Sequence, residues 1–104
     1  MWVAQQLGPG ERPILVAYPL GFDWMFLYWY FVAFSKTGSP FDFSSALDMK
    51  TMYQQKARVP VSRAGRNDLP AELRSMSPHT HNALDDAIEQ ADIFCRLFEL
   101  VGPG

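Results

Sequence analysis

The sequence predicts an α/β domain with short central strands flanked by helices, and three stretches of the chain support this prediction. Residues 13–18 contain an unbroken apolar row, which is typical of a strand buried on both faces, either in a parallel sheet or at the centre of a sheet. Residues 23–34 are apolar and aromatic, and the chain from Asn82 onward repeats its apolar residues at the three and four spacing of a helix. Strands that alternate with helices favour this fold class.

Length and composition limit what the protein can be. A chain of 104 residues is expected to form one domain, 1–104, with a modest core. Its net charge of -2 creates no general attraction for nucleic acid, so any such binding needs a local site. The single cysteine, Cys95, falls on the apolar side of the last helix, where we expect it in the core. One cysteine excludes an intrachain disulfide, which fits a reducing, cytoplasmic location.

The first third of the chain is expected to hold a helix end, a strand and a helix. Residues 1–7 are predicted to be the last turns of a helix, closed by the glycines and proline of 8–10. After the strand at 13–18, residues 19–21 are its expected exit turn, and Asp23 stands where the apolar helix would begin. Because this helix is apolar all round, we expect a sheet, other helices or a second chain to cover it.

The apolar run at 13–34 is not expected to cross a membrane. Pro19, Gly21 and Asp23 interrupt it, and the uninterrupted part at 24–34 is shorter than the roughly 20 residues that a spanning helix needs. A secretory signal is not indicated either, because no positively charged segment followed by an apolar one opens the chain.

The middle of the chain is expected to hold a second short strand around 46–48, a helix at 49–56 and a short helix at 70–74 capped by Asn67 or Asp68. Residues 56–66 include a lysine and three arginines but no acid, namely Lys56, Arg58, Arg63 and Arg66. A basic loop of this kind either holds phosphates or forms solvated surface.

The last helix, from Asn82, has two sides of different chemistry. We expect its apolar side to be buried, and this side consists of Leu84, Ala87, Ile88, Ala91, Phe94, Cys95 and Phe98. We expect the opposite side to be solvated, and it consists of Asp85, Glu89, Asp92, Arg96 and Glu99. Asp86 belongs to neither side, since its helical phase places it near Gln90, Ile93 and Leu97.

Asp86 and His81 together form the first candidate site. His81 precedes the helix, so the spacing of the pair brings an imidazole and a carboxylate to one end of that helix. A carboxylate beside a packed face needs hydrogen-bond donors, a cation or a metal. The simpler alternatives are that Asp86 favours the helix dipole and that His81 is a loop residue. The simpler alternative for Asp23 is likewise that it favours the helix dipole, as an acid in the first turn of a helix.

The stretch PLGFDWMFL at 19–27 and the stretch HNALDDA at 81–87 resemble the second and third motifs of the DEDDh family of 3′-5′ exonucleases. That family has an RNase H-like fold and includes oligoribonuclease and the proofreading subunit of the bacterial replicative polymerase. The second motif, an aspartate after an aromatic, maps onto Phe22 and Asp23. The third, a histidine five residues before a metal-binding aspartate, maps onto His81 and Asp86.

The resemblance implies hydrolysis of phosphodiester bonds by two metal ions, Mg²⁺ or Mn²⁺, at the 3′ end of single-stranded DNA or RNA. Asp23 and Asp86 would be the metal ligands and His81 the general base, since histidine titrates near working pH. Phe22 and the arginines of the basic segment, Arg58, Arg63 and Arg66, would contact the substrate.

The resemblance covers the later part of a family domain, and two features depart from it. The first family motif is absent, because no aspartate in the chain is followed two residues later by a glutamate. Pro19 stands where many members have asparagine. We therefore expect an exonuclease domain shortened at its amino end, without its opening antiparallel strands. Such a chain would self-associate or bind a complementing amino-terminal segment.

Two other functions remain open from the sequence. A catalytically inactive RNase H-like remnant would serve as a nucleic-acid or protein binding module. A small phosphohydrolase with a single metal would use His79, His81 and Asp86, although no further ligand is identifiable.

Overall fold

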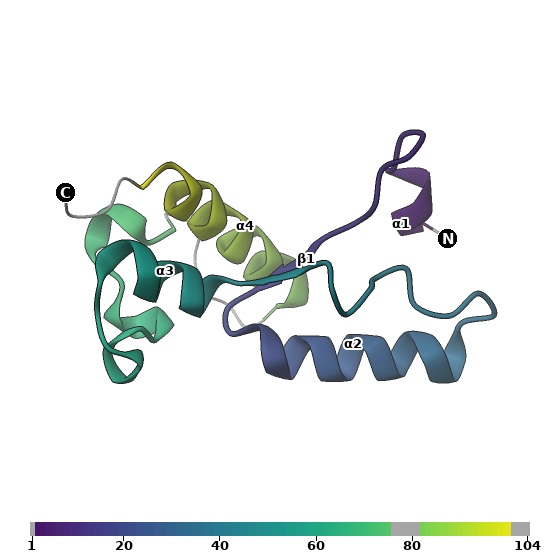
Figure 1. Cartoon of the computed structure of the whole chain (residues 1–104), viewed down its shortest axis with the longest axis horizontal. Coiled ribbons are helices and arrows are strands. Elements are labelled where there is room, and N and C mark those ends of the chain that lie inside the picture. The colour runs from purple at the N-terminus through teal and green to yellow at the C-terminus, as the bar shows by residue number, and fades with distance from the viewer. Residues whose placement is uncertain (1, 76–81, 101–104) are drawn as a thin grey trace. The chain divides into compact units, whose positions relative to one another are not determined.

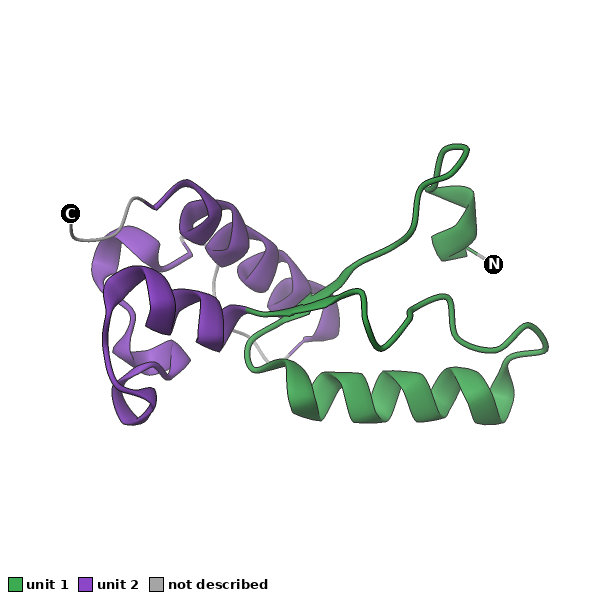
Figure 2. Ribbon diagram, viewed as in Figure 1, with its two compact units in different colours: residues 1–48 green, residues 49–104 purple. Residues whose placement is uncertain are grey.

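The computed structural model describes residues 2–75 and 82–100 of the chain. The chain divides into two compact units, residues 1–48 and residues 49–104, which Figure 2 shows in different colours. Both strands belong to the first unit, and the described part of the second unit is helical. The chain is therefore a mixed α/β protein, as the sequence predicts.

A small parallel sheet of two strands organises the first unit (Figure 1). Strands β1 (Leu15–Ala17) and β2 (Ala46–Asp48) pair in parallel, so that Ala17 lies opposite Asp48. Ala17 and the following Tyr18 are buried, whereas the other residues of β1 are half-buried. Both strands lie within the stretches that the sequence predicts, and the sheet is parallel. The expectation that the first strand is buried on both faces is not met, because Leu15 and Val16 are only half-buried.

A short helix, α1 (Trp2–Gln5), precedes the sheet. The chain then turns at Gly10, whose φ of 76° lies in the left-handed region that glycine adopts without a steric penalty. A helix followed by a glycine turn is what the sequence predicts for this stretch.

Helix α2 (Leu20–Phe34) begins earlier than expected. Its N-cap is Pro19, which has no side-chain donor or acceptor for the helix end, and the carboxylate of Asp48 instead accepts a hydrogen bond from the Leu20 N–H at 3.0 Å. The exit turn predicted at 19–21 is therefore wrong, because Leu20 and Gly21 already belong to the helix. Asp48 lies at the end of β2, so a contact between distant parts of the chain sets this helix start.

Every residue of α2 is described, and none is buried. Its aromatic rings pack against one another along the helix instead. Phe22 and Phe26 have ring centroids 4.7 Å apart, and Trp24 stacks on Tyr28 at 5.2 Å. The expectation that this helix is covered is thus not met by the described parts of the chain, which leave 65% of Phe22 exposed. Within the same parts, no helix is long and apolar enough to cross a membrane.

The described residues of the second unit form two α-helices, α3 (Met49–Ala57) and α4 (Ala83–Glu99). Three one-turn 3₁₀ helices lie between them in the sequence, namely η1 (Val61–Arg63), η2 (Arg66–Asp68) and η3 (Ala71–Leu73). The buried apolar side chains of this unit are Met49, Tyr53, Ala64, Leu69, Leu73, Ile93 and Leu97. Residues from both helices, η3 and the connecting segments therefore share one core.

A lysine links the two helices of this unit. The Nζ of Lys56, near the end of α3, donates hydrogen bonds to the backbone oxygens of Leu97 and Phe98, at 2.8 Å and 2.9 Å. The last carbonyl groups of a helix lack partners within the helix, and a cation there also interacts favourably with the helix dipole. Lys56 thus fixes the carboxyl end of α4 against α3.

A short helix lies where one is predicted at 70–74, namely η3, but Pro70 is its N-cap, so the prediction that Asn67 or Asp68 caps it is wrong. The turn η2 precedes it as a separate element. Leu69 precedes a proline and has an extended backbone, φ -64° and ψ 136°. The proline ring disfavours a helical conformation in the preceding residue, which separates the two turns. Asp68 still caps a helix start, because its Oδ2 accepts a hydrogen bond from the Gly65 N–H at 3.0 Å.

The bounds of α4 match the prediction, but the buried side of the helix does not. Ile93 and Leu97 are buried together with Glu89, whereas Leu84 and Phe98 of the expected apolar side are 67% and 68% exposed. Cys95, expected in the core, is also exposed. The helix has apolar residues on two sides, and the core of the second unit covers the side of Ile93 and Leu97.

Candidate functional site

Asp86 lies in the first turn of α4, in helical phase with the residues that the core of the second unit covers. Its side chain is half-buried, and its Oδ1 atom is shielded from solvent. One turn further along, Glu89 is buried, and Ile93 follows on the same side. Since successive helix residues are about 100° apart, Asp85 projects in a different direction. The assignment of Asp86 to the side of Ile93 is thus confirmed, and this side is the buried one.

Asn82 caps the helix just ahead of Asp86. Its Oδ1 accepts hydrogen bonds from the backbone N–H groups of Leu84 and Asp85, at 2.9 Å and 3.4 Å. These N–H groups have no partner inside the helix, so the cap stabilises the first turn. The cap therefore determines where α4 starts and, with it, the position of the Asp86 carboxylate. His81, the proposed base, and His79 lie outside the described residues.

Asp23 lies in the first turn of α2, in the first unit, and is half-buried. The start of this helix follows β1 and lies at the carboxyl end of the parallel sheet, where Asp48 bonds the Leu20 N–H. Ligands of α/β proteins usually bind at this end of the strands. Phe22, the expected substrate contact beside Asp23, is exposed. Asp23 and Asp86 belong to different units.

The three arginines of the basic segment have different environments. Arg58 has a positive φ of 57° directly after α3, and the Val59 N–H donates to the Gln54 oxygen at 3.3 Å. A left-handed residue with such a bond is a common way to end a helix, so the backbone of Arg58 terminates α3. Arg63, in η1, is exposed. These two side chains are exposed and do not line the pocket that contains Arg66.

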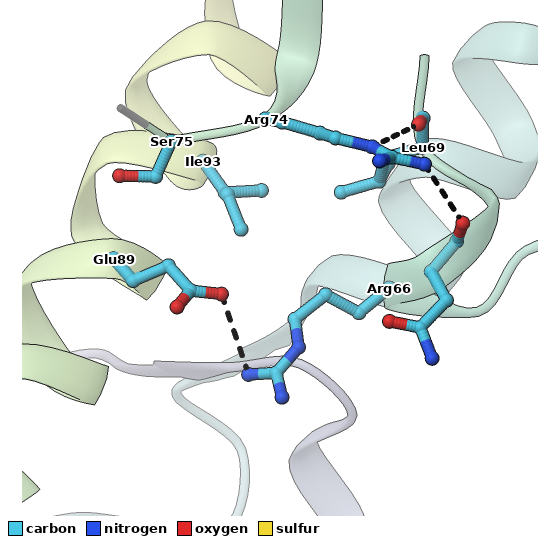
Figure 3. A pocket seen from close by; sticks show the side chains of 7 residues that line it. Arg66, Leu69, Arg74, Ser75, Glu89 and Ile93 are labelled. Carbon is cyan, nitrogen blue, oxygen red and sulfur yellow. Dashed lines mark hydrogen bonds and ion pairs between the residues drawn. The ribbon is translucent and has the colours of Figure 1, made fainter. Parts of the chain in front are cut away.

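Arg66 contributes to a pocket of about 660 Å³ within the second unit, shown in Figure 3. Its guanidinium Nη1 lies 3.7 Å from Oε1 of Glu89, which projects from α4. The Glu89 residue is only 9% exposed, so Arg66 partly compensates the cost of burying this carboxylate. Glu89 was expected on a solvated face, and that prediction is wrong because η2 places Arg66 over that side of α4.

A second arginine, Arg74, lines the same pocket (Figure 3). Its Nε donates to the backbone oxygen of Leu69 at 2.8 Å, and its Nη2 donates to that of Asn67 at 3.0 Å. Two bonds from one planar group hold the guanidinium in a fixed orientation. Arg74 was not predicted as a site residue, since it lies beyond the basic segment and only the folding of η2 and η3 brings it to the same pocket as Arg66.

Asp48 is another acid that the sequence analysis did not assign to a site. Its position at the end of the predicted strand 46–48 could have identified it as a site residue, because the carboxyl ends of parallel strands meet at one edge of a sheet.

Across residues 2–75 and 82–100, no three histidine, cysteine, aspartate or glutamate side chains come close enough together to hold a metal ion.

The chain has sequence similarity to a curated bacterial protein. The chain is 27% identical over 93 residues to a protein of Escherichia coli named 3′-5′ DNA exonuclease Cap18. The match covers 89% of this chain and 49% of the relative, so the chain spans about half the length of the curated relative it matches. No protein-family profile matches the chain. No solved structure matches it either. The similarity is therefore to about half of a protein named as an exonuclease, at low identity.

Proposed function

We propose that this chain is part of a 3′-5′ exonuclease of the DEDDh family, with an RNase H-like fold, that acts on single-stranded nucleic-acid ends. The observation that carries the proposal is the position of Asp86. This carboxylate follows the Asn82 cap in the first turn of α4, and one of its oxygens is shielded from solvent. The spacing of His81 and Asp86 and the similarity to a protein named as a 3′-5′ exonuclease support the same function.

Asp86 and Asp23 are the residues that would hold Mg²⁺ or Mn²⁺. Both are half-buried carboxylates in the first turn of a helix, and hard cations prefer anionic oxygen ligands. When bound, two such ions would supply activation of water and stabilisation of the leaving oxygen. The residues of the chain have simpler tasks. The carboxylates of Asp23 and Asp86 supply negatively charged oxygen ligands for the metal ions. The imidazole of His81 accepts the proton of the attacking water.

The test is degradation of single-stranded oligonucleotides labelled at either end, in the presence of Mn²⁺. We expect products that shorten from the 3′ end, and we expect Asp86→Asn to lower the rate by at least about a hundredfold, the scale on which a directly participating group acts. Asp85→Asn is the matched control, because it removes the same charge from the adjacent residue of the same helical turn.

Equal loss of activity in Asp85→Asn and Asp86→Asn would contradict the assignment of Asp86. Thermal unfolding of both variants shows whether either substitution has disturbed the fold. Shortening from the 5′ end would contradict the proposed polarity.

A binding module without catalysis is the second candidate. It is favoured by the absence of an Asp-x-Glu sequence from the chain, since two acids provide few ligands for two divalent ions. This candidate predicts that single-stranded DNA or RNA binds equally well to the unaltered chain and to Asp86→Asn. A fluorescence-anisotropy titration without metal measures that affinity, and it separates the two candidates when combined with the cleavage assay.

A further inference from the structure

The pocket of the second unit has the size and chemistry of a site for a small organic anion. Its volume of about 660 Å³ lies within the range of pockets that take small ligands. Three segments supply its walls: η2 contributes Arg66, the end of η3 leads to Arg74, and α4 contributes Glu89. All of these segments belong to the second unit.

Two guanidinium groups line this pocket, and both have donors that remain available. The ion pair between Arg66 and Glu89 is 3.7 Å long, beyond the distance of a good hydrogen bond. The bonds of Arg74 to backbone oxygens use Nε and one hydrogen of Nη2, and a guanidinium has five N–H donors in all. Guanidinium groups match the geometry of phosphate oxygens, so the pair favours a phosphate group.

The other residues that line the pocket favour particular chemical features in the rest of the ligand. Leu69, which lies beside Arg74, and Ile93 contribute the apolar part of the pocket lining (Figure 3). The carboxylate of Glu89 only accepts hydrogen bonds when ionised, so it favours a ligand that carries N–H donors. A ligand that suits the pocket therefore combines an anionic group, a flat or apolar body and an amino group.

We propose that this pocket binds a nucleoside monophosphate, with the phosphate bound by Arg66 and Arg74 and the base lying against Leu69 and Ile93. The amino group of the base donates to Glu89. The choice of a nucleotide among such anions rests on the proposed function, because a 3′-5′ exonuclease releases mononucleotides. The preference for an anion rests on the two arginines alone. Neither Asp23 nor Asp86 is among the residues that line this pocket.

The experiment is a calorimetric titration of the full chain with AMP, adenosine and inorganic phosphate, in a buffer that contains a chelator and no divalent metal. AMP is expected to bind at least about tenfold more tightly than adenosine or phosphate, because it alone uses both walls of the pocket. Affinity is expected to fall as salt concentration rises, since two charged side chains contribute.

Three variants test which groups are responsible. Arg66→Gln should weaken AMP binding by about tenfold or more, the scale of a hydrogen bond to a charged group. Glu89→Gln should weaken AMP binding by a smaller factor, because a neutral amide oxygen is a weaker acceptor for the amino group of the base than a carboxylate, whereas binding of inorganic phosphate, which has no amino group, should not weaken. Arg12→Gln is the matched control, since it removes the same charge from an exposed position in the first unit. A loss of AMP binding in Glu89→Gln with unchanged binding of phosphate would not arise from loss of folding.

The proposal is overturned if AMP shows no saturable binding, or if AMP and phosphate bind equally well. It is also overturned if Arg66→Gln and Arg12→Gln behave alike in thermally stable samples. Failure of the nuclease can be told apart from failure of the pocket. A chain that binds AMP without cutting oligonucleotides contradicts the proposed function only, and one that cuts without binding AMP contradicts the pocket only.

Discussion

Helices α2 and α4 differ in a way that hydrophobicity does not explain. Helix α2 is apolar on every side, yet none of its residues is buried. Helix α4 carries charges over much of its surface, yet Ile93 and Leu97 on it are buried together with the carboxylate of Glu89. The second unit provides α3 and the 3₁₀ segments to pack against α4, whereas the first unit offers α2 a sheet of two short strands.

The difference shows that burial depends on the neighbours an element has, as well as on its own composition. The apolar side of α4 around Leu84 and Phe98 illustrates this within one helix, because it remains exposed while Leu97 is covered. Stability and self-association should therefore reside in different parts of the chain. Substitutions in the core of the second unit should affect folding, and substitutions on α2 should affect contacts between chains.

The largest expected effect concerns two leucines of α4. Leu97→Ala removes a fully buried side chain, so we expect the free energy of unfolding to fall by about 2–5 kcal/mol. Leu84→Ala removes the same atoms from an exposed site of the same helix, and should change it by less than about 0.5 kcal/mol. Urea denaturation followed by circular dichroism measures both. Similar losses in the two variants would mean that the exposed side of α4 is covered in solution.

A smaller effect is expected at the start of α2. Asp48→Ala removes the acceptor for the Leu20 N–H, and loss of a helix cap costs about 1 kcal/mol. Hydrogen exchange at the Leu20 amide should become faster, while exchange in the second unit should be unchanged. Asp42→Ala, on an exposed residue before β2, serves as the control. Unaltered protection of Leu20 would show that another group caps the helix.

The smallest effect on folding is expected on the aromatic surface of α2. Phe26→Ser replaces an exposed ring and should change the free energy of unfolding by less than about 0.5 kcal/mol. The same substitution should reduce self-association, because exposed apolar patches promote contacts between molecules. Sedimentation velocity at several concentrations compares this variant with Ala33→Ser on the same helix. A large loss of stability would mean that α2 is buried by another part of the protein.

The elements with strong local patterns were predictable from the sequence. The strands at 15–17 and 46–48 match short apolar stretches, and α4 begins after Asn82, which is a favourable capping residue. The phase of Asp86 followed from the geometry of one helix. Each of these predictions uses information contained within a few neighbouring residues.

The wrong predictions concern structural features that depend on residues far apart in the sequence. Asp48 caps a helix that starts 28 residues earlier in the chain, so the residues near Leu20 did not predict where that helix begins. The covered side of α4 depends on where η2 and η3 pack, and the pocket with Arg66 and Glu89 exists only after that packing. His81 lies outside the described residues, so its role stays a prediction.

The construction of the pocket has a thermodynamic consequence. Its walls come from segments that must fold together, so a ligand that occupies it binds the folded second unit and not the unfolded chain. Such a ligand adds to the stability of the protein by mass action, about 2.7 kcal/mol at a free concentration one hundred times its dissociation constant. The melting temperature of the chain thereby becomes a sensor of occupancy, and a small collection of anions can be ranked by the temperature at which each sample unfolds.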